Sequence, residues 1–117
     1  MSLFYALIAV TLVQIAHLVE EIKTGFHRKH PLGPLPLWIM VVVNALLYAG
    51  AAVIVVLVLR NHSLGVTLAW TYGFVLAGNA LAHIGIMIWR RQYFPGGVTA
   101  VLLLPALAYL GYQLLGR

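Results

Sequence analysis

Four long apolar stretches dominate the sequence and restrict the folds that it can adopt. They cover residues 3–22, 37–59, 64–89 and 98–115, and only short connectors separate them. A bilayer core about 30 Å thick is crossed by about 20 helical residues, with a usable range of roughly 17–25. Each stretch is long enough to cross. The sequence therefore predicts an all-α fold, an integral membrane four-helix bundle that forms a single domain over residues 1–117.

The composition supports a membrane protein and excludes several other classes. Hydrophobic residues make up 63% of the 117 residues and charged residues 8%, whereas a soluble domain is roughly one-quarter charged. Disordered chains are poor in apolar residues, so disorder is excluded as well. The chain has no cysteine, which excludes a disulfide framework, a thiolate metal site and a cysteine nucleophile. We expect a multi-pass protein of the plasma (inner) membrane.

The distribution of Lys and Arg predicts an orientation. The first and third connectors hold Lys23, Arg28, Lys29, Arg90 and Arg91, and the opposite side holds Arg60 and Arg117. Positively charged loops remain in the cytoplasm, so we expect these two connectors inside and both termini on the extracytoplasmic side. The net charge of +5 is explained by loops at an anionic membrane surface and does not indicate a nucleic acid partner.

Polar residues inside the apolar stretches lie at similar depths. A charge at the centre of a membrane helix costs about 2.5–3.5 kcal/mol on insertion scales, so polar groups there need partners or a purpose. At a rise of 1.5 Å per residue, His17, Asn44 and His83 lie about 9–12 Å from the cytoplasmic ends of their helices. Gln14 and Asn79 lie about one turn deeper, each on the helix face of a histidine. We expect one shared polar site in the cytoplasmic third of the bundle.

The strongest candidate for chemistry is the segment from His17 to Glu21. Glu20 and Glu21 occupy the i+3 and i+4 positions, which neighbour His17 on a helix, and they are the only acidic residues of the chain. Two histidines and a carboxylate, with further positions open, suit catalytic zinc or iron(II). We therefore expect His17, Glu20, Glu21 and His83 to hold a divalent metal, zinc or iron(II), and one glutamate to serve as general base or acid.

Four further polar residues are expected around these ligands. They are Gln14, Asn44, Asn79 and Tyr93. An asparagine there can add a ligand or fix the tautomer of a histidine, while the tyrosine shapes the mouth of the site.

The same residues resemble a known family of small membrane proteins. The chain contains, in order, His17-x-x-Glu20-Glu21, Asn79-x-x-x-His83 and Tyr93-x-Pro95-Gly96. These elements are similar to those of the HXXEE-domain family, in the same order and over nearly the full length. The resemblance implies an all-helical membrane domain. The biochemical activity of that family is unassigned, so the resemblance does not imply a reaction.

The expected function is that of a small metal-dependent enzyme acting on a lipid-like or isoprenoid-like substrate. Zinc predicts hydrolysis by an activated water, and iron predicts oxidation. The basic connectors suit anionic lipid headgroups, and they also suit a substrate with a phosphate or carboxylate head. The expected partners are membrane lipid and a lipid-like small molecule, without nucleic acid, and a homo-oligomer remains open.

Three other functions fit the same residues. The first is a metal-free lipid isomerase or cyclase, in which a glutamate gives a proton and a histidine accepts one. The second is a small proton-coupled transporter, which the length and the four spans match. The third is a partner subunit in which the polar network only sets how the helices pack.

Overall fold

A computed structural model describes residues 2–117, and within that range the chain forms four long helices and one short one. The long helices are α1 (Ser2–Thr24), α3 (Leu37–Leu59), α4 (Ser63–Arg90) and α5 (Gly97–Leu115). The short helix α2 (Phe26–Lys29) is a single turn after α1. All four long helices have the length and apolar composition needed to cross a membrane, so the predicted all-α architecture is confirmed.

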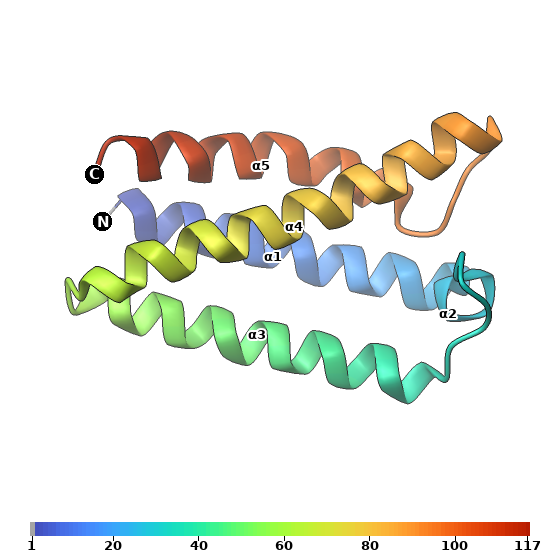
Figure 1. Cartoon of the computed structure of the whole chain (residues 1–117), viewed down its shortest axis with the longest axis horizontal. Coiled ribbons are helices and arrows are strands. Elements are labelled where there is room, and N and C mark those ends of the chain that lie inside the picture. The colour runs from blue at the N-terminus through green and yellow to red at the C-terminus, as the bar shows by residue number, and fades with distance from the viewer. Residues whose placement is uncertain (1) are drawn as a thin grey trace.

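The four long helices form a ring in which each contacts the next in the order α1, α3, α4, α5. The two termini lie at one end of the bundle together with the turn between α3 and α4 (Figure 1). Helix α2 and the connector between α4 and α5 lie at the other end (Figure 1). The two basic connectors therefore share one end of the bundle, because two long helices, α3 and α4, lie between them in the chain.

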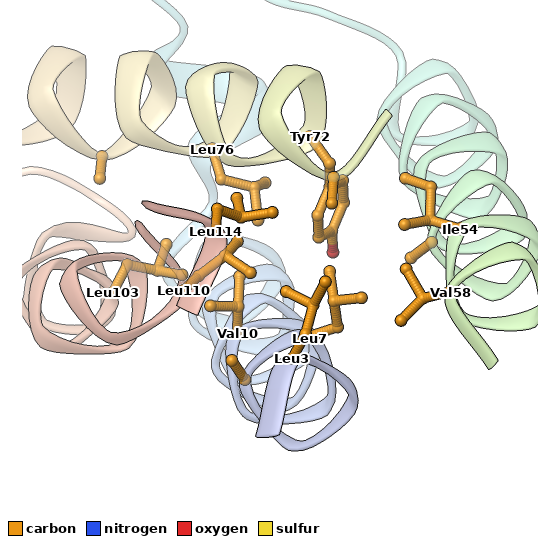
Figure 2. Close-up of a cluster of buried hydrophobic side chains, with 14 of the residues drawn as sticks. Leu3, Leu7, Val10, Ile54, Val58, Tyr72, Leu76, Leu103, Leu110 and Leu114 are labelled. Atoms are coloured by element: carbon orange, nitrogen blue, oxygen red, sulfur yellow. The ribbon is translucent and has the colours of Figure 1, made fainter. Parts of the chain in front are cut away.

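An apolar core extends from the end of the bundle with the termini past its middle, and Ala100 and Leu103 near the start of α5 belong to it. From α1, Leu3, Leu7 and Val10 recur at the spacing of one helix face and point between the neighbouring helices (Figure 2). The other labelled side chains of this core are Ile54 and Val58 from α3, Tyr72 and Leu76 from α4, and Leu103, Leu110 and Leu114 from α5 (Figure 2). Fully buried alanines on three helices let the backbones approach closely: Ala6, Ala69, Ala80 and Ala100.

Helix α3 packs less closely than the others. It buries only Met40, Ala51, Ile54 and Val58, whereas its remaining side chains are partly or fully exposed. Its mean hydropathy in the candidate span is the highest of the four helices, as expected for a helix that presents most of its surface to lipid. This loose packing leaves room beside α1 and α4, near the end of the bundle that carries α2.

The two connectors at that end are sharply bent. Gly25 has φ of 76°, a conformation that suits glycine, and it separates α1 from α2. The sequence predicts a structured loop over 24–36, and the structure places the helical turn of α2 within it. Gly96 has φ of 82° and directly precedes α5. Its position brings the Pro95 carbonyl group and the first turn of α5 against α1 and α4.

Candidate metal centre

Polar side chains occupy the part of the bundle that the apolar core leaves. Gln14, His17, Glu21 and His83 are the buried polar residues of the described chain, with exposed fractions between 0 and 4%. His17 and Glu21 lie on successive turns of α1, and His83 faces them from α4. One ligand atom from each of His17, Glu21 and His83 lies within 4.8 Å of the other two. The two helices therefore bring two imidazoles and one acid together, as the motif spacing predicts.

Both imidazoles approach the same carboxylate oxygen. The Nε2 atom of His83 lies 3.2 Å from Oε1 of Glu21, and the Nε2 atom of His17 lies 3.4 Å from that oxygen. The two rings are 4.7 Å apart between centroids and nearly perpendicular, at 82°. The shared oxygen is therefore the point on which the centre converges.

The hydrogen bond of His83 fixes which of its nitrogens carries a proton. Its Nδ1 atom lies 2.7 Å from the carbonyl oxygen of Pro95. A carbonyl oxygen only accepts hydrogen bonds, so Nδ1 of His83 is the donor. In the neutral ring the lone pair is then on Nε2, the atom that faces Glu21.

His17 is fixed in the same tautomer by an indirect route. Its Nδ1 atom lies 2.8 Å from Oγ1 of Thr99. That hydroxyl donates its single proton to Oε2 of Glu20 at 2.5 Å, and therefore accepts from Nδ1 of His17. The Nε2 atom of His17 is thus also left with its lone pair toward the centre.

The Nε2 lone pair of His83 faces the Glu21 oxygen with no donor between them, whereas the Nε2 lone pair of His17 has the amide of Asn79 as its donor. Such a lone pair and a carboxylate oxygen repel each other unless a positive charge or a proton lies between them. The side chain of Glu21 is only 6% exposed, and an ionised carboxylate without a partner is costly in such surroundings. A proton on one imidazole, a proton on Glu21 or a metal ion held by the three side chains would each remove this repulsion.

The distances suit a metal as well as a proton. Zinc holds nitrogen and oxygen ligands at about 2.0–2.2 Å, which in a tetrahedron sets neighbouring ligands about 3.3–3.6 Å apart. The separations of 3.2 and 3.4 Å from the two histidines to Glu21 are close to that range, and all three ligand atoms lie within 4.8 Å of one another. The amide nitrogen of Asn79 lies 3.1 Å from Nε2 of His17, so metal binding requires that amide to turn and present its oxygen or withdraw.

The structure separates the two glutamates. Both carboxylate oxygens of Glu20 are bound at the start of α5, where they accept from the backbone N–H groups of Val98 and Thr99 and from the Thr99 hydroxyl. Gly96 offers no side chain to cap α5, so Glu20 caps it from α1. The ligand group, by which we mean the possible metal ligands His17, Glu21 and His83, therefore contains Glu21 and not Glu20, because positions i+3 and i+4 diverge around the helix.

Tyr93 belongs to the Glu20 side of the site. Its hydroxyl donates to Oε1 of Glu20 at 2.5 Å. Partial burial and this bond to a carboxylate raise the pKa of Tyr93 above its ordinary value of about 10. The phenol therefore remains a proton donor throughout the physiological range, and the bond contributes stability that is lost only as the pH rises above about 10.

The remaining predicted residues line a neighbouring cavity and are not part of the ligand group. Gln14, Asn44 and Asn79 all border it. The amide nitrogen of Asn44 donates to the carbonyl oxygen of Met40, one turn earlier. Asn79 is the member of this set that touches both the cavity and His17.

Thr99 and the Pro95 carbonyl group are site residues that the sequence analysis missed. Each binds the Nδ1 atom of one histidine. Thr99 lies within a long apolar stretch without a recognisable motif, and a backbone carbonyl leaves no mark in a sequence. The Tyr93-x-Pro95-Gly96 element was the available signal for the second contact.

Gly96→Ala is expected to disrupt the centre. A Cβ atom at position 96 would lie 2.7 Å from Cε1 of His17 and 2.9 Å from Cε1 of His83, so both rings would have to move. The left-handed backbone alone costs an alanine about 1–2 kcal/mol. Thermal unfolding of purified protein should show a clear loss of stability.

Gly85→Ala is the matched control for this substitution. Gly85 lies in α4 with nothing within 4 Å of its added Cβ. Alanine is the better helix former by about 0.5–1 kcal/mol, so this variant should be unchanged or more stable. Equal behaviour of the two variants would contradict the close approach of Gly96 to the rings.

The comparisons with known proteins identify a family over most of the chain. The family model described as "Protein of unknown function with HXXEE motif" matches residues 7–110. This range includes all three residues of the ligand group. No curated protein and no solved structure matches the chain.

Proposed function

The chain belongs to the HXXEE family, and from that premise we propose that it is a metal-dependent membrane enzyme acting on a lipid-like substrate. His17, His83 and Glu21 would hold the metal. One observation carries the proposal: two histidines with occupied Nδ1 atoms turn their Nε2 atoms toward one buried carboxylate oxygen. Histidine ligands of metals are commonly fixed in this way through their second nitrogen.

The ligand types favour a catalytic metal over a structural one. Structural zinc sites are closed by four protein ligands, whereas catalytic sites have three and keep a position open. Two imidazoles and a carboxylate suit catalytic zinc, and they also suit iron(II) in a facial triad. Zinc would supply an activated water for hydrolysis, and iron would supply oxidation chemistry.

In this proposal Glu20 is a positioning residue. Its carboxylate holds Thr99, and Thr99 in turn accepts from Nδ1 of His17. Both of its oxygens already accept hydrogen bonds, which leaves Glu20 poorly suited to the role of general base. The motif would thus contain one ligand and one residue that orients a ligand.

A metal-free acid–base site is the second candidate, and the contact of Asn79 favours it. The Asn79 amide donates to the very lone pair of His17 that a metal would use. With a proton on His83, the group would be a Glu–His pair able to move a proton, as a lipid isomerase, a cyclase or a proton-coupled transporter needs. Metal content separates the two candidates.

The direct test is metal analysis of protein purified without an affinity metal and without chelator. We expect about one zinc or iron ion per chain, and the element found decides between hydrolysis and oxidation. His17→Ala should lose most of the metal because it removes one of three ligands. The matched control is His62→Ala, since His62 is exposed in the turn at the opposite end of the bundle.

The outcome that contradicts the metal proposal is a folded protein without stoichiometric metal. Activity or proton flux that persists in strong chelator would support the metal-free site. A His17→Ala protein that merely fails to assemble, with no metal in the parent protein, would favour a structural network in a partner subunit.

The orientation also belongs to the proposal. We place the end with α2 in the cytoplasm of the plasma (inner) membrane and both termini outside, because that end carries five of the seven Lys and Arg residues. The chain has no cysteine, so single-cysteine variants are uniquely labelled. An impermeant maleimide should label His62→Cys on intact cells and spare Arg28→Cys, and the reverse pattern would invert the assignment.

A further inference from the structure

A cavity of about 570 Å³ lies between α1, α3 and α4, directly beside the histidine–glutamate centre. This volume falls within the range of about 300–1,000 Å³ typical of small-molecule sites. Glu21 and Asn79 border the cavity, whereas neither His17 nor His83 does. A molecule in the cavity would therefore meet the centre past the carboxylate of Glu21 and the amide of Asn79.

The cavity opens toward lipid and not toward one end of the bundle alone. Val43 and Leu46 of α3 line it and are 58% and 68% exposed, and Val75 of α4 lines it and is 54% exposed. These apolar side chains lie within two of the candidate membrane spans, where the surroundings are acyl chains. An apolar molecule can therefore enter sideways from the bilayer, between α3 and α4.

The charges around the cavity disfavour an anionic head group. Among the described residues that line it, none is Lys or Arg, the one acidic residue is Glu21, and the one histidine is His30, in the connector after α2. The five basic residues at this end are all exposed, and none of them lines the cavity. A phosphate or carboxylate would have to give up water beside a carboxylate, which is unfavourable.

Neutral polar groups offer the head group its partners. Gln14, Asn44 and Asn79 line the cavity with amide side chains. Gln14 is only 2% exposed, and its Oε1 atom has no hydrogen-bond partner. An unpartnered amide oxygen in such a place is costly, and a hydroxyl group that donates to it would relieve that cost.

We infer that this cavity binds an uncharged single-chain lipid, a long-chain alcohol, with its hydroxyl group beside Glu21 and Asn79. As an account of the substrate, the inference rests on the proposed function. As an account of binding, it rests on the cavity, its lateral opening and its neutral amides. It replaces the anionic head group that the basic connectors suggest with a neutral one.

The test is photolabelling with a long-chain alcohol that carries a diazirine in its chain. Purified protein in lipid nanodiscs is treated with chelator and labelled at increasing probe concentration, with the labelled peptides identified by mass spectrometry. We expect saturable labelling of the α3 and α4 segments that line the cavity. An unlabelled alcohol of equal chain length should compete at least tenfold better than the corresponding fatty acid or alkyl phosphate.

Two neighbouring substitutions supply the matched control. Val43→Trp should narrow the opening and lower the apparent affinity at least tenfold. Val42→Trp adds the same side chain one residue away on α3, where Val42 is 47% exposed and does not line the cavity, and should change the affinity less than twofold. Equal effects of the two variants, or better competition by the anionic lipids, would overturn the inference.

The failures of the two proposals can be told apart. If the protein bound the alcohol saturably but held no metal as purified, the lipid site in the cavity would be supported and the proposal of a metal-dependent enzyme would be contradicted. If the protein held stoichiometric metal but showed no saturable labelling, the metal centre would be supported and the proposal that the cavity binds a lipid would be contradicted.

Discussion

Glu21→Gln is expected to lower metal affinity more than about 100-fold while the protein still folds. Substitutions of residues that merely orient metal ligands cost about 10–100-fold, so the loss of a ligand should cost more. The variant should fold because a glutamine amide can donate to the Nε2 atoms that now face the carboxylate. Metal content and thermal unfolding of the same preparation measure the two effects together.

Glu20→Gln is the natural control, because it removes the only other acidic residue of the chain. It should retain metal at saturating concentration, since Glu20 lies outside the ligand group. If the two variants exchanged their behaviour, Glu20 would be the ligand and the assignment of Glu21 would be wrong. If the metal affinity of both variants equalled that of the parent protein, neither glutamate would be a metal ligand.

Glu20→Ala is expected to destabilise the fold by about 1.5–3 kcal/mol, the scale of a hydrogen bond to a charged group. The substitution removes the side chain that caps α5, so the N–H groups of Val98 and Thr99 lose their acceptor. It also frees the Thr99 hydroxyl that fixes His17. Metal affinity should therefore fall as well, by about 10–100-fold.

The free energy of unfolding, measured by denaturant titration in detergent micelles, checks the stability effect. Lys23→Ala is a suitable control because Lys23 is an exposed charge on the same helix, and its loss should cost less than about 0.5 kcal/mol. A Glu20→Ala protein as stable as the Lys23→Ala protein would show that the contacts at the start of α5 contribute little.

The sequence analysis predicted the helices well because their signal is local. Each of the four apolar stretches lies within one long helix of the structure, and the ends differ by at most two residues. The depth argument was equally local, since a fixed rise per residue sets His17 and His83 at matching levels. The same reasoning brought the two histidines to one group, which the structure contains.

The roles of the two glutamates lay beyond such reasoning. Positions i+3 and i+4 both neighbour His17, so helical spacing alone made both glutamates candidate ligands. The choice between them depends on where α5 begins, because its unpaired N–H groups take the carboxylate of Glu20. These two hydrogen bonds join Glu20 to Val98 and Thr99, which follow it in the chain by 78 and 79 positions.

The sequence by itself determined four membrane-length helices, a buried polar level and the residue types gathered there. Hydrophobicity and helical periodicity act over a few residues, so they can be read directly from the chain. The tertiary structure alone decided which glutamate faces the histidines, which tautomer each histidine adopts, and where a lipid-facing cavity opens. These features arise from contacts among α1, α3, α4 and α5, and such contacts depend on the packing angles and rotations of whole helices.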